Sequence, residues 1–106
     1  MKGDVVVLPF PFSDLSKSRK RPALVVADLK AQDIILCQIT SKARIDDYCI
    51  VLGNDDFKQG GLNLTSMIRP NKLFTADKSI ILYRIGSLKK EKIKEVETEL
   101  VKIFKR

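Results

Sequence analysis

The apolar residues of this chain change their spacing near residue 87, and that change constrains the fold more than any other feature. Before it, apolar residues stand in short runs rich in Val and Ile, separated by Gly, Pro, Asp and Ser. Short runs of this composition, bounded by turn residues, predict β-strands. After it, apolar residues recur at steps of three and four, which predicts a single amphipathic helix.

Six runs predict strands, and prolines and glycines mark where they stop. We expect Pro9 and Pro11 to stop the first strand, and Pro22 to be tolerated only at the start of the second. Pro70 indicates an edge strand or a bend, and residues 53–63, with three of the five glycines, predict a loop. The predicted strands are residues 4–10, 21–29, 33–40, 48–52, 65–77 and 78–86.

The C-terminal helix is predicted to begin after Ser87, a residue type that caps helix N-termini well. Ile93, Val96, Leu100 and Phe104 would then share one face. The 106 residues suit one domain, 1–106, with one core. The predicted fold class is mostly β, a small barrel of antiparallel strands with a C-terminal helix packed on it.

Charge and residue content exclude several classes of function. The net charge of +7 favours a polyanionic partner, and the absence of histidine excludes Ser-His-Asp and Cys-His catalysis. Cys37 and Cys49 lie in apolar runs, so we interpret them as buried free thiols. No run is long enough to span a membrane, and the N-terminus reads as a strand, so a cytoplasmic protein is expected.

Two polar motifs stand where strands begin or end. In SRKRP, Arg21 lies next to Pro22 and can place two N–H donors on a phosphate, with Arg19 and Lys20 on the loop side; a solvated turn is the alternative. In QITSK, residues 38–42, two hydroxyls and an ammonium follow one another in Thr40, Ser41 and Lys42. These three could bind a phosphate, or they could be ordinary strand-end residues.

Paired carboxylates are the remaining candidates. Asp46-Asp47 and Asp55-Asp56 could hold Mg²⁺ through oxygen atoms, but neither pair has the spacing of a known metal motif. Gly60-Gly61 indicates only a turn. We therefore predict no metal and no cofactor.

Four segments in order resemble the MazF/PemK family of type II toxins. They are G-D-V at the start, K-R-P-A-L-V-V after a loop, I-T-S-K at a strand end, and R-I-G-x-L before the helix. The resemblance implies an SH3-like barrel, a homodimer neutralised by an acidic antitoxin, and metal-independent cleavage of single-stranded RNA to a 2′,3′-cyclic phosphate. It places the family's catalytic residues at Arg21 and Thr40.

Other residues are expected to contact RNA or to cover the site. Arg19, Lys20, Ser41 and Lys42 are expected to bind RNA, with Lys20 and Lys42 raising the local positive potential. Ser66 and Arg69 would line the RNA groove. The loop at residues 13–20 should cover the site, and Phe10 and Phe12 would either stack on bases or anchor the core.

Two alternatives remain at this stage. One is a gyrase poison of the same fold, although such relatives depend on a C-terminal tail around a Trp, and this chain has no Trp. The other is a non-catalytic nucleic-acid-binding barrel, which would bind with a steep salt dependence and would not cleave.

Overall fold

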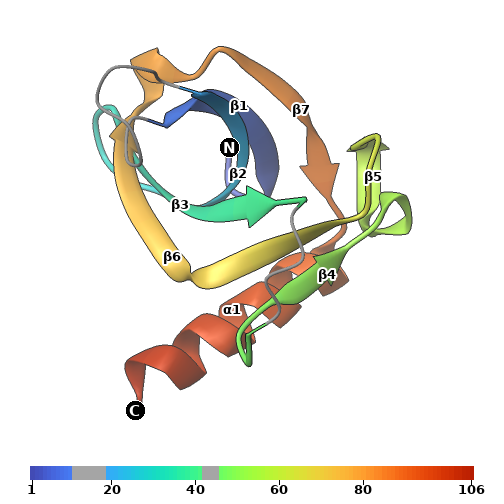
Figure 1. The fold of residues 1–106 in the computed structure, drawn as a ribbon. Helices are drawn as coiled ribbons and strands as arrows, with labels where there is room; N and C mark the ends of the chain where they lie inside the picture. The colour runs from blue at the N-terminus through green and yellow to red at the C-terminus, as the bar shows by residue number, and fades with distance from the viewer. Residues whose placement is uncertain (11–18, 42–45) are drawn as a thin grey trace.

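The computed structural model describes residues 1–10, 19–41 and 46–106 and shows a curled sheet with an α-helix against it (Figure 1). All strand pairs are antiparallel. The predicted fold class is confirmed, as a half-barrel of seven strands with a C-terminal helix. The elements are β1 (Asp4–Phe10), β2 (Arg19–Asp28), β3 (Asp33–Thr40), β4 (Ile50–Leu52), the 3₁₀ turn η1 (Asn54–Asp56), β5 (Phe57–Gly60), β6 (Ser66–Asp77), the 3₁₀ turn η2 (Lys78–Ile80), β7 (Tyr83–Leu88) and α1 (Lys90–Phe104).

The strand order is β4-β6-β3-β2-β1-β7-β5, so β4 and β5 are the edges of the sheet. Two apolar clusters fill its two faces. Val6, Leu8 and Leu36 belong to the cluster round which the sheet curls, whereas Val5 and Leu24 belong to the cluster that Val96 of α1 covers. The alternation of Val5 with Val6 and Leu8 is the period of two that a strand buried on both faces requires.

Two prolines lie inside strands that we expected them to stop. β1 runs through Pro9, and β2 begins at Arg19, three residues before Pro22. Both prolines stand where the strand has a partner on one side only, because β7 pairs with β1 only as far as Val7 and β3 pairs with β2 only from Ala23 onward. A missing N–H group costs nothing on an open side, so the sequence-based boundaries were too strict.

Pro70 marks a bend and not an edge. β6 lies between β4 and β3, but its pairing with β3 passes from Arg69 directly to Leu73, leaving residues 70–72 without a partner. β4 pairs with β6 only over Ser66–Ile68. Pro70 therefore stands where β6 has lost both neighbours, which is where a strand tolerates proline.

The prediction of a loop at residues 53–63 is wrong, because this segment contains η1 and the edge strand β5. A Cβ atom on Gly60 would lie 2.1 Å from the carbonyl oxygen of Ile85, and one on Gly86 would lie 2.2 Å from that of Gln59. The two glycines thus allow β5 and β7 to approach more closely than side chains permit. Glycine here indicates close packing of strands, not a loop.

The helix begins later than predicted, because Ser87 belongs to β7 and the N-cap residue is Lys89. The Ser87 hydroxyl donates a hydrogen bond to Asp4 and accepts one from Arg84, both at 2.9 Å. Val96 is buried in the core as expected, but Phe104, the last residue of α1, is 72% exposed and is not covered by the sheet. The predicted strand at residues 78–86 is η2 followed by β7.

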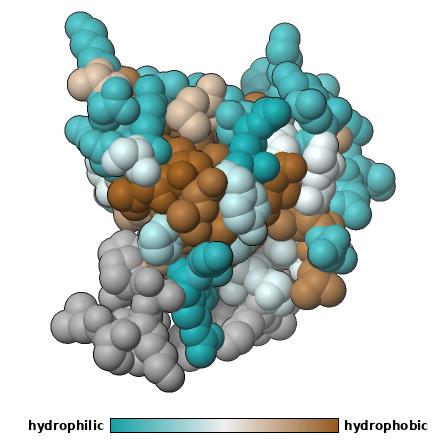
Figure 2. All heavy atoms as spheres, turned by 90° about the horizontal axis from the view of Figure 1, so that it is seen from above, coloured by the Kyte–Doolittle hydropathy of each residue, from teal (hydrophilic) through white to brown (hydrophobic). Residues whose placement is uncertain are grey.

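The buried-thiol prediction is confirmed for Cys37, whose pKa burial raises to about 12, whereas Cys49 is only half-buried. No helix in the described ranges is long and apolar enough to cross a membrane. Seen from above, an apolar surface lies at the centre of the molecule with hydrophilic side chains round it (Figure 2). Ile80 and Leu82, in the η2–β7 segment at the top of Figure 1, are among the exposed apolar residues.

Candidate active site

The candidate site lies where β2 and β3 part. The two strands pair up to Ala23 and Gln38, but Arg21 and Thr40, which would form the next pair on that face, are not paired. Arg21 is paired with Leu8 of β1, and Thr40 is paired with Met67 of β6. This divergence opens the sheet between two strands and leaves a guanidinium-bearing residue on one side and a hydroxyl-bearing residue on the other.

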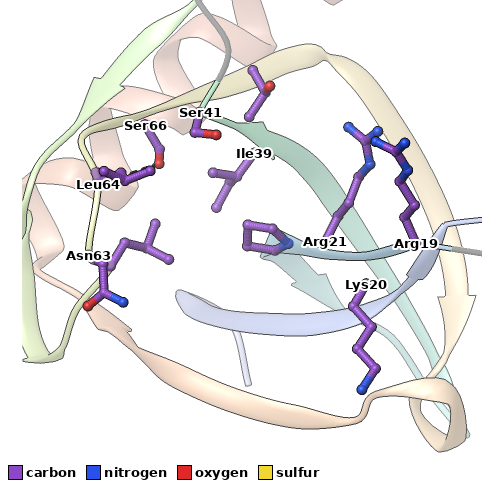
Figure 3. A pocket seen from close by; sticks show the side chains of 11 residues that line it. Arg19, Lys20, Arg21, Ile39, Ser41, Asn63, Leu64 and Ser66 are labelled. Carbon is purple, nitrogen blue, oxygen red and sulfur yellow. Dashed lines mark hydrogen bonds between the residues drawn. The ribbon is translucent and has the colours of Figure 1, made fainter.

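A pocket of about 400 Å³ occupies this opening, and we call it the Arg21 pocket. Figure 3 shows Arg19 and Arg21 of β2 on one side of it and Asn63, Leu64 and Ser66 on the other, with Ser41 at the end of β3 between them. It unites six of the eight residues that the sequence indicated as a site. The described lining residues are Arg19, Lys20, Arg21, Pro22, Ile39, Thr40, Ser41, Leu62, Asn63, Leu64 and Ser66.

Three cations dominate the charge of the Arg21 pocket. Arg19 and Lys20 are exposed and Arg21 is half-buried, and none of the three forms an ion pair with another described residue. No carboxylate is among the described lining residues. Arg19 and Arg21 extend to the same side of β2, and Lys20 extends to the opposite side, as strand alternation requires (Figure 3). The sequence motif grouped Arg19 with Lys20, whereas the strand groups Arg19 with Arg21.

Hydroxyl groups form the opposite wall. Thr40 is the last residue of β3 and Ser41 follows it, exposed. Ser66, at the start of β6, is buried, and its hydroxyl donates a hydrogen bond of 3.1 Å to the carbonyl oxygen of Leu64. Cations that face hydroxyl donors across an open pocket suit a phosphate group, because hydrogen bonds between charged partners are about twice as strong as neutral ones.

Sequence reasoning missed the third wall of the Arg21 pocket, made by Leu62, Asn63 and Leu64. The side-chain oxygen of Asn54 accepts a hydrogen bond from the Leu62 N–H group, which ties this segment to η1. Leu64 is 66% exposed and lies across the Arg21 pocket from Arg19 and Arg21 (Figure 3). Nothing in the sequence around Leu64 distinguishes it from a loop residue.

Two predicted RNA contacts do not lie among the lining residues. Lys42 is outside the described residues, as are Phe12 and the loop at residues 13–18. Arg69 lines a separate cavity, and its Nη2 lies 3.2 Å from Oδ2 of Asp46. Phe10 is buried, as the anchor interpretation expected.

Asp46 holds the chain before β4 against β6. It accepts hydrogen bonds from the backbone N–H groups of Tyr48 and Cys49 and from the side chains of Arg69 and Asn71. The Tyr48 N–H first, and then the other donors, lower the pKa of Asp46 to about 2. This carboxylate is therefore occupied as an acceptor, and the described residues contain no group of three carboxylates or thiols that could share a metal ion.

The two outer motifs, G-D-V and R-I-G-x-L, meet away from the Arg21 pocket. The Arg84 guanidinium donates a hydrogen bond to the Ser87 hydroxyl, and that hydroxyl donates one to the Asp4 carboxylate. Nη1 of Arg84 also lies 3.5 Å from Oδ1 of Asp4. Gly3 has a φ of +91°, and a Cβ there would lie 2.5 Å from Ile93 of α1. These motifs join the two ends of the chain, whereas the two inner motifs form the pocket.

Comparisons with known proteins bear on the family and the fold. A family model described as "PemK-like, MazF-like toxin of type II toxin-antitoxin system" matches residues 1–104. No curated protein matches the chain in sequence.

Three solved structures are similar in fold. An endoribonuclease in complex with its cognate antitoxin from Mycobacterial species has a TM-score of 0.76 and 16% identity, over 96% of this chain and 91% of that one. MazF from Deinococcus radiodurans has a TM-score of 0.75 and 19% identity, over 98% and 94%. The Mycobacterium tuberculosis toxin MazF-mt6 has a TM-score of 0.74 and 15% identity, over 96% of each chain.

Proposed function

Because the chain belongs to the PemK-like, MazF-like toxins of type II toxin–antitoxin systems, we propose that it is an endoribonuclease that cleaves single-stranded RNA. Cleavage would occur at short sequence motifs, in the cytoplasm, without a metal ion. The observation that carries the proposal is the Arg21 pocket, where Arg19 and Arg21, which form no ion pair with a described residue, lie across the gap between β2 and β3 from hydroxyl groups. The structural neighbour from Mycobacterial species, an endoribonuclease, supports it.

The proposed reaction uses a nucleophile that the substrate supplies. The 2′-OH attacks the adjacent phosphorus, the bond to the 5′-oxygen breaks, and a 2′,3′-cyclic phosphate and a 5′-hydroxyl result. The protein must stabilise the negative charge that develops on the phosphorane, which is usually the largest single contribution to such catalysis.

Arg21 and Thr40 are the residues to which we assign that stabilisation. Arg21 carries a planar fork of donors that matches two phosphate oxygens, and half-burial limits the competition from water. Thr40 offers a hydroxyl from the other side of the opening. Arg19 and Lys20, both exposed, attract the RNA backbone before it reaches the pocket.

An acidic antitoxin and a second copy of the chain are the proposed protein partners. The net charge of +7 is complementary to an acidic segment, and one structural neighbour was solved in complex with its cognate antitoxin. Sedimentation of the purified chain, with and without the product of an adjacent reading frame, tests both partners.

Cleavage of single-stranded RNA in EDTA by the purified chain is the test of the proposed activity. Arg21→Ala should abolish cutting while the far-UV circular dichroism spectrum stays unchanged. Lys30→Ala is the matched control, because Lys30 is an exposed cation outside the Arg21 pocket and its loss changes the net charge equally. Equal activity in the two variants would refute the role of Arg21.

The same experiment separates the alternatives. RNA binding that falls steeply with salt, without any product after long incubation, identifies a non-catalytic barrel. Inhibition of gyrase supercoiling, with RNA left intact, identifies a gyrase poison.

A further inference from the structure

A second cavity, of about 370 Å³, lies beside the Arg21 pocket, and we call it the Gln38 cavity. Its volume is within the range of small-ligand pockets. Three apolar side chains and three polar ones line it. They are Phe10, Leu73 and Phe74, with Gln38, Arg69 and Lys72.

Two polar groups of the Gln38 cavity have no hydrogen-bond partner among the described residues. The Nε atom of Arg69 is buried and makes no hydrogen bond, although Nη2 of the same guanidinium contacts Asp46. The side-chain amide of Gln38, which is half-buried, also makes no hydrogen bond to another described residue. A buried donor without a partner is costly, so Arg69 Nε–H in particular favours a ligand atom that accepts a hydrogen bond.

Two aromatic rings form part of the apolar wall of the Gln38 cavity. Phe10 and Phe74 meet edge to face, with ring centroids 4.9 Å apart and planes at 73°. Phe10 is buried, whereas Phe74 is only partly covered. Aromatic rings beside an amide and a guanidinium are the elements with which proteins hold unstacked RNA bases.

The position of the Gln38 cavity relates it to the proposed cleavage site. Gln38 pairs with Ala23 on one side and with Arg69 on the other, and it precedes Thr40 by two residues on the same strand. Gln38 and Thr40 therefore point to the same face of β3, about 7 Å apart along the strand. That separation allows a base in the Gln38 cavity to belong to a nucleotide next to a phosphate at Thr40.

We propose that the Gln38 cavity binds one RNA base next to the scissile phosphate, and that Gln38 reads the edge of this base. The proposal rests on the proposed function, because it concerns the same RNA. The amide of Gln38 can both donate to and accept from a base, Arg69 Nε–H adds a donor, and exposed Lys72 neutralises the neighbouring phosphate.

Mapping of cleavage sites in a randomised RNA pool, by sequencing of the new 5′-hydroxyl ends, tests the proposal. Gln38→Leu keeps the size of the side chain and removes its hydrogen bonds. It should reduce the preference at one base position next to the cut about tenfold or more, and leave the other positions unchanged. Gln32→Leu, the same change at an exposed turn residue, is the matched control.

Gln38→Glu keeps the shape but removes the amide donor, so it should shift the preference at that position toward a base that presents an amino group. Each variant is compared with the unmodified chain by thermal melting, and Gln38→Glu carries the test if Gln38→Leu does not fold. An unchanged preference in a folded Gln38 variant overturns the proposal while the endoribonuclease activity stands.

A nucleotide titration tests the Gln38 cavity independently of cleavage. Adding AMP, GMP, CMP and UMP in turn to the ¹⁵N-labelled chain should shift the side-chain amide resonances of Gln38 with at least one nucleotide. The Gln32 resonances should stay in place. If the chain cuts no RNA, the proposed function fails, but the titration still tests whether the Gln38 cavity binds a base. The absence of a Gln38 shift with every nucleotide overturns the base-binding proposal.

Discussion

Gly86→Ala is predicted to detach the edge strand β5, although it adds only one methyl group. Gly86 pairs with Gly60 across the β5–β7 ladder. The new Cβ would lie 2.2 Å from the carbonyl oxygen of Gln59 and 3.0 Å from the Cα of Gly60. Both atoms belong to the backbone, so no side-chain rotation relieves the contact.

The distances give the magnitude. Ordinary contact begins at 3.4 Å, so β5 and β7 must separate by about 1.2 Å (3.4 minus 2.2). Ladder hydrogen bonds with donor–acceptor distances near 2.9 Å do not survive that separation. Overpacking of this kind costs about 1–3 kcal/mol, which lowers Tm by at least about 4 °C in a domain of this size.

The measurement is urea unfolding followed by far-UV circular dichroism, because the chain has no Trp. Gly53→Ala is the matched control, since a Cβ there meets nothing within 4 Å, and its free energy of unfolding should stay within about 1 kcal/mol of that of the unmodified chain. β5 leads into Leu62 and Leu64 of the Arg21 pocket, so Gly86→Ala should also weaken RNA binding. Equal stability of the two variants would refute the close-approach explanation.

Three further results are expected. Arg21→Ala should abolish cleavage in a gel assay, whereas Arg19→Ala should mainly weaken binding and reduce its salt slope by about 1; identical behaviour would contradict the division of roles. The pKa of Asp46 is lowered from 3.8 to about 2, so its contribution to stability is complete above about pH 4 and is lost as pH falls toward 2. Urea midpoints should therefore fall over that range, and less so in Asp46→Asn. In a thiol-reagent assay, Cys49 should react well before Cys37, because Cys37 is buried with a pKa of about 12; equal rates would contradict this.

The β class, most strand positions and the C-terminal helix could be predicted from the sequence. The spacing of apolar residues that indicates them depends only on neighbouring residues. The errors occur where pairing between residues far apart in the sequence determines the local structure. Gly60 reads locally as a turn residue and Gly86 as the last residue of a strand, and only the β5–β7 contact explains why both are glycine. Ser87 reads locally as an N-cap, but it belongs to β7, where its hydroxyl donates a hydrogen bond to Asp4 near the other end of the chain.

The candidate site divides in the same way. Residue type and position at strand ends indicated Arg21 and Thr40, and the resemblance to a family strengthened that choice. The wall at Leu62 and Leu64 depends on where β5 places the chain, which no local pattern encodes. Gln38 looked like an ordinary strand residue, because only the pairing with Arg69 brings it beside an unsatisfied donor.

The pairing of β1 with β7 also sets the order in which a newly made chain can fold. Asp4 is paired with Ser87, so the half-barrel cannot close until β7 has left the ribosome. Before that point β1 has only β2 beside it. Such distant pairing is slow to form. During translation there is therefore an interval in which Arg21 and Thr40 have been synthesised but the closed half-barrel that positions them has not yet formed.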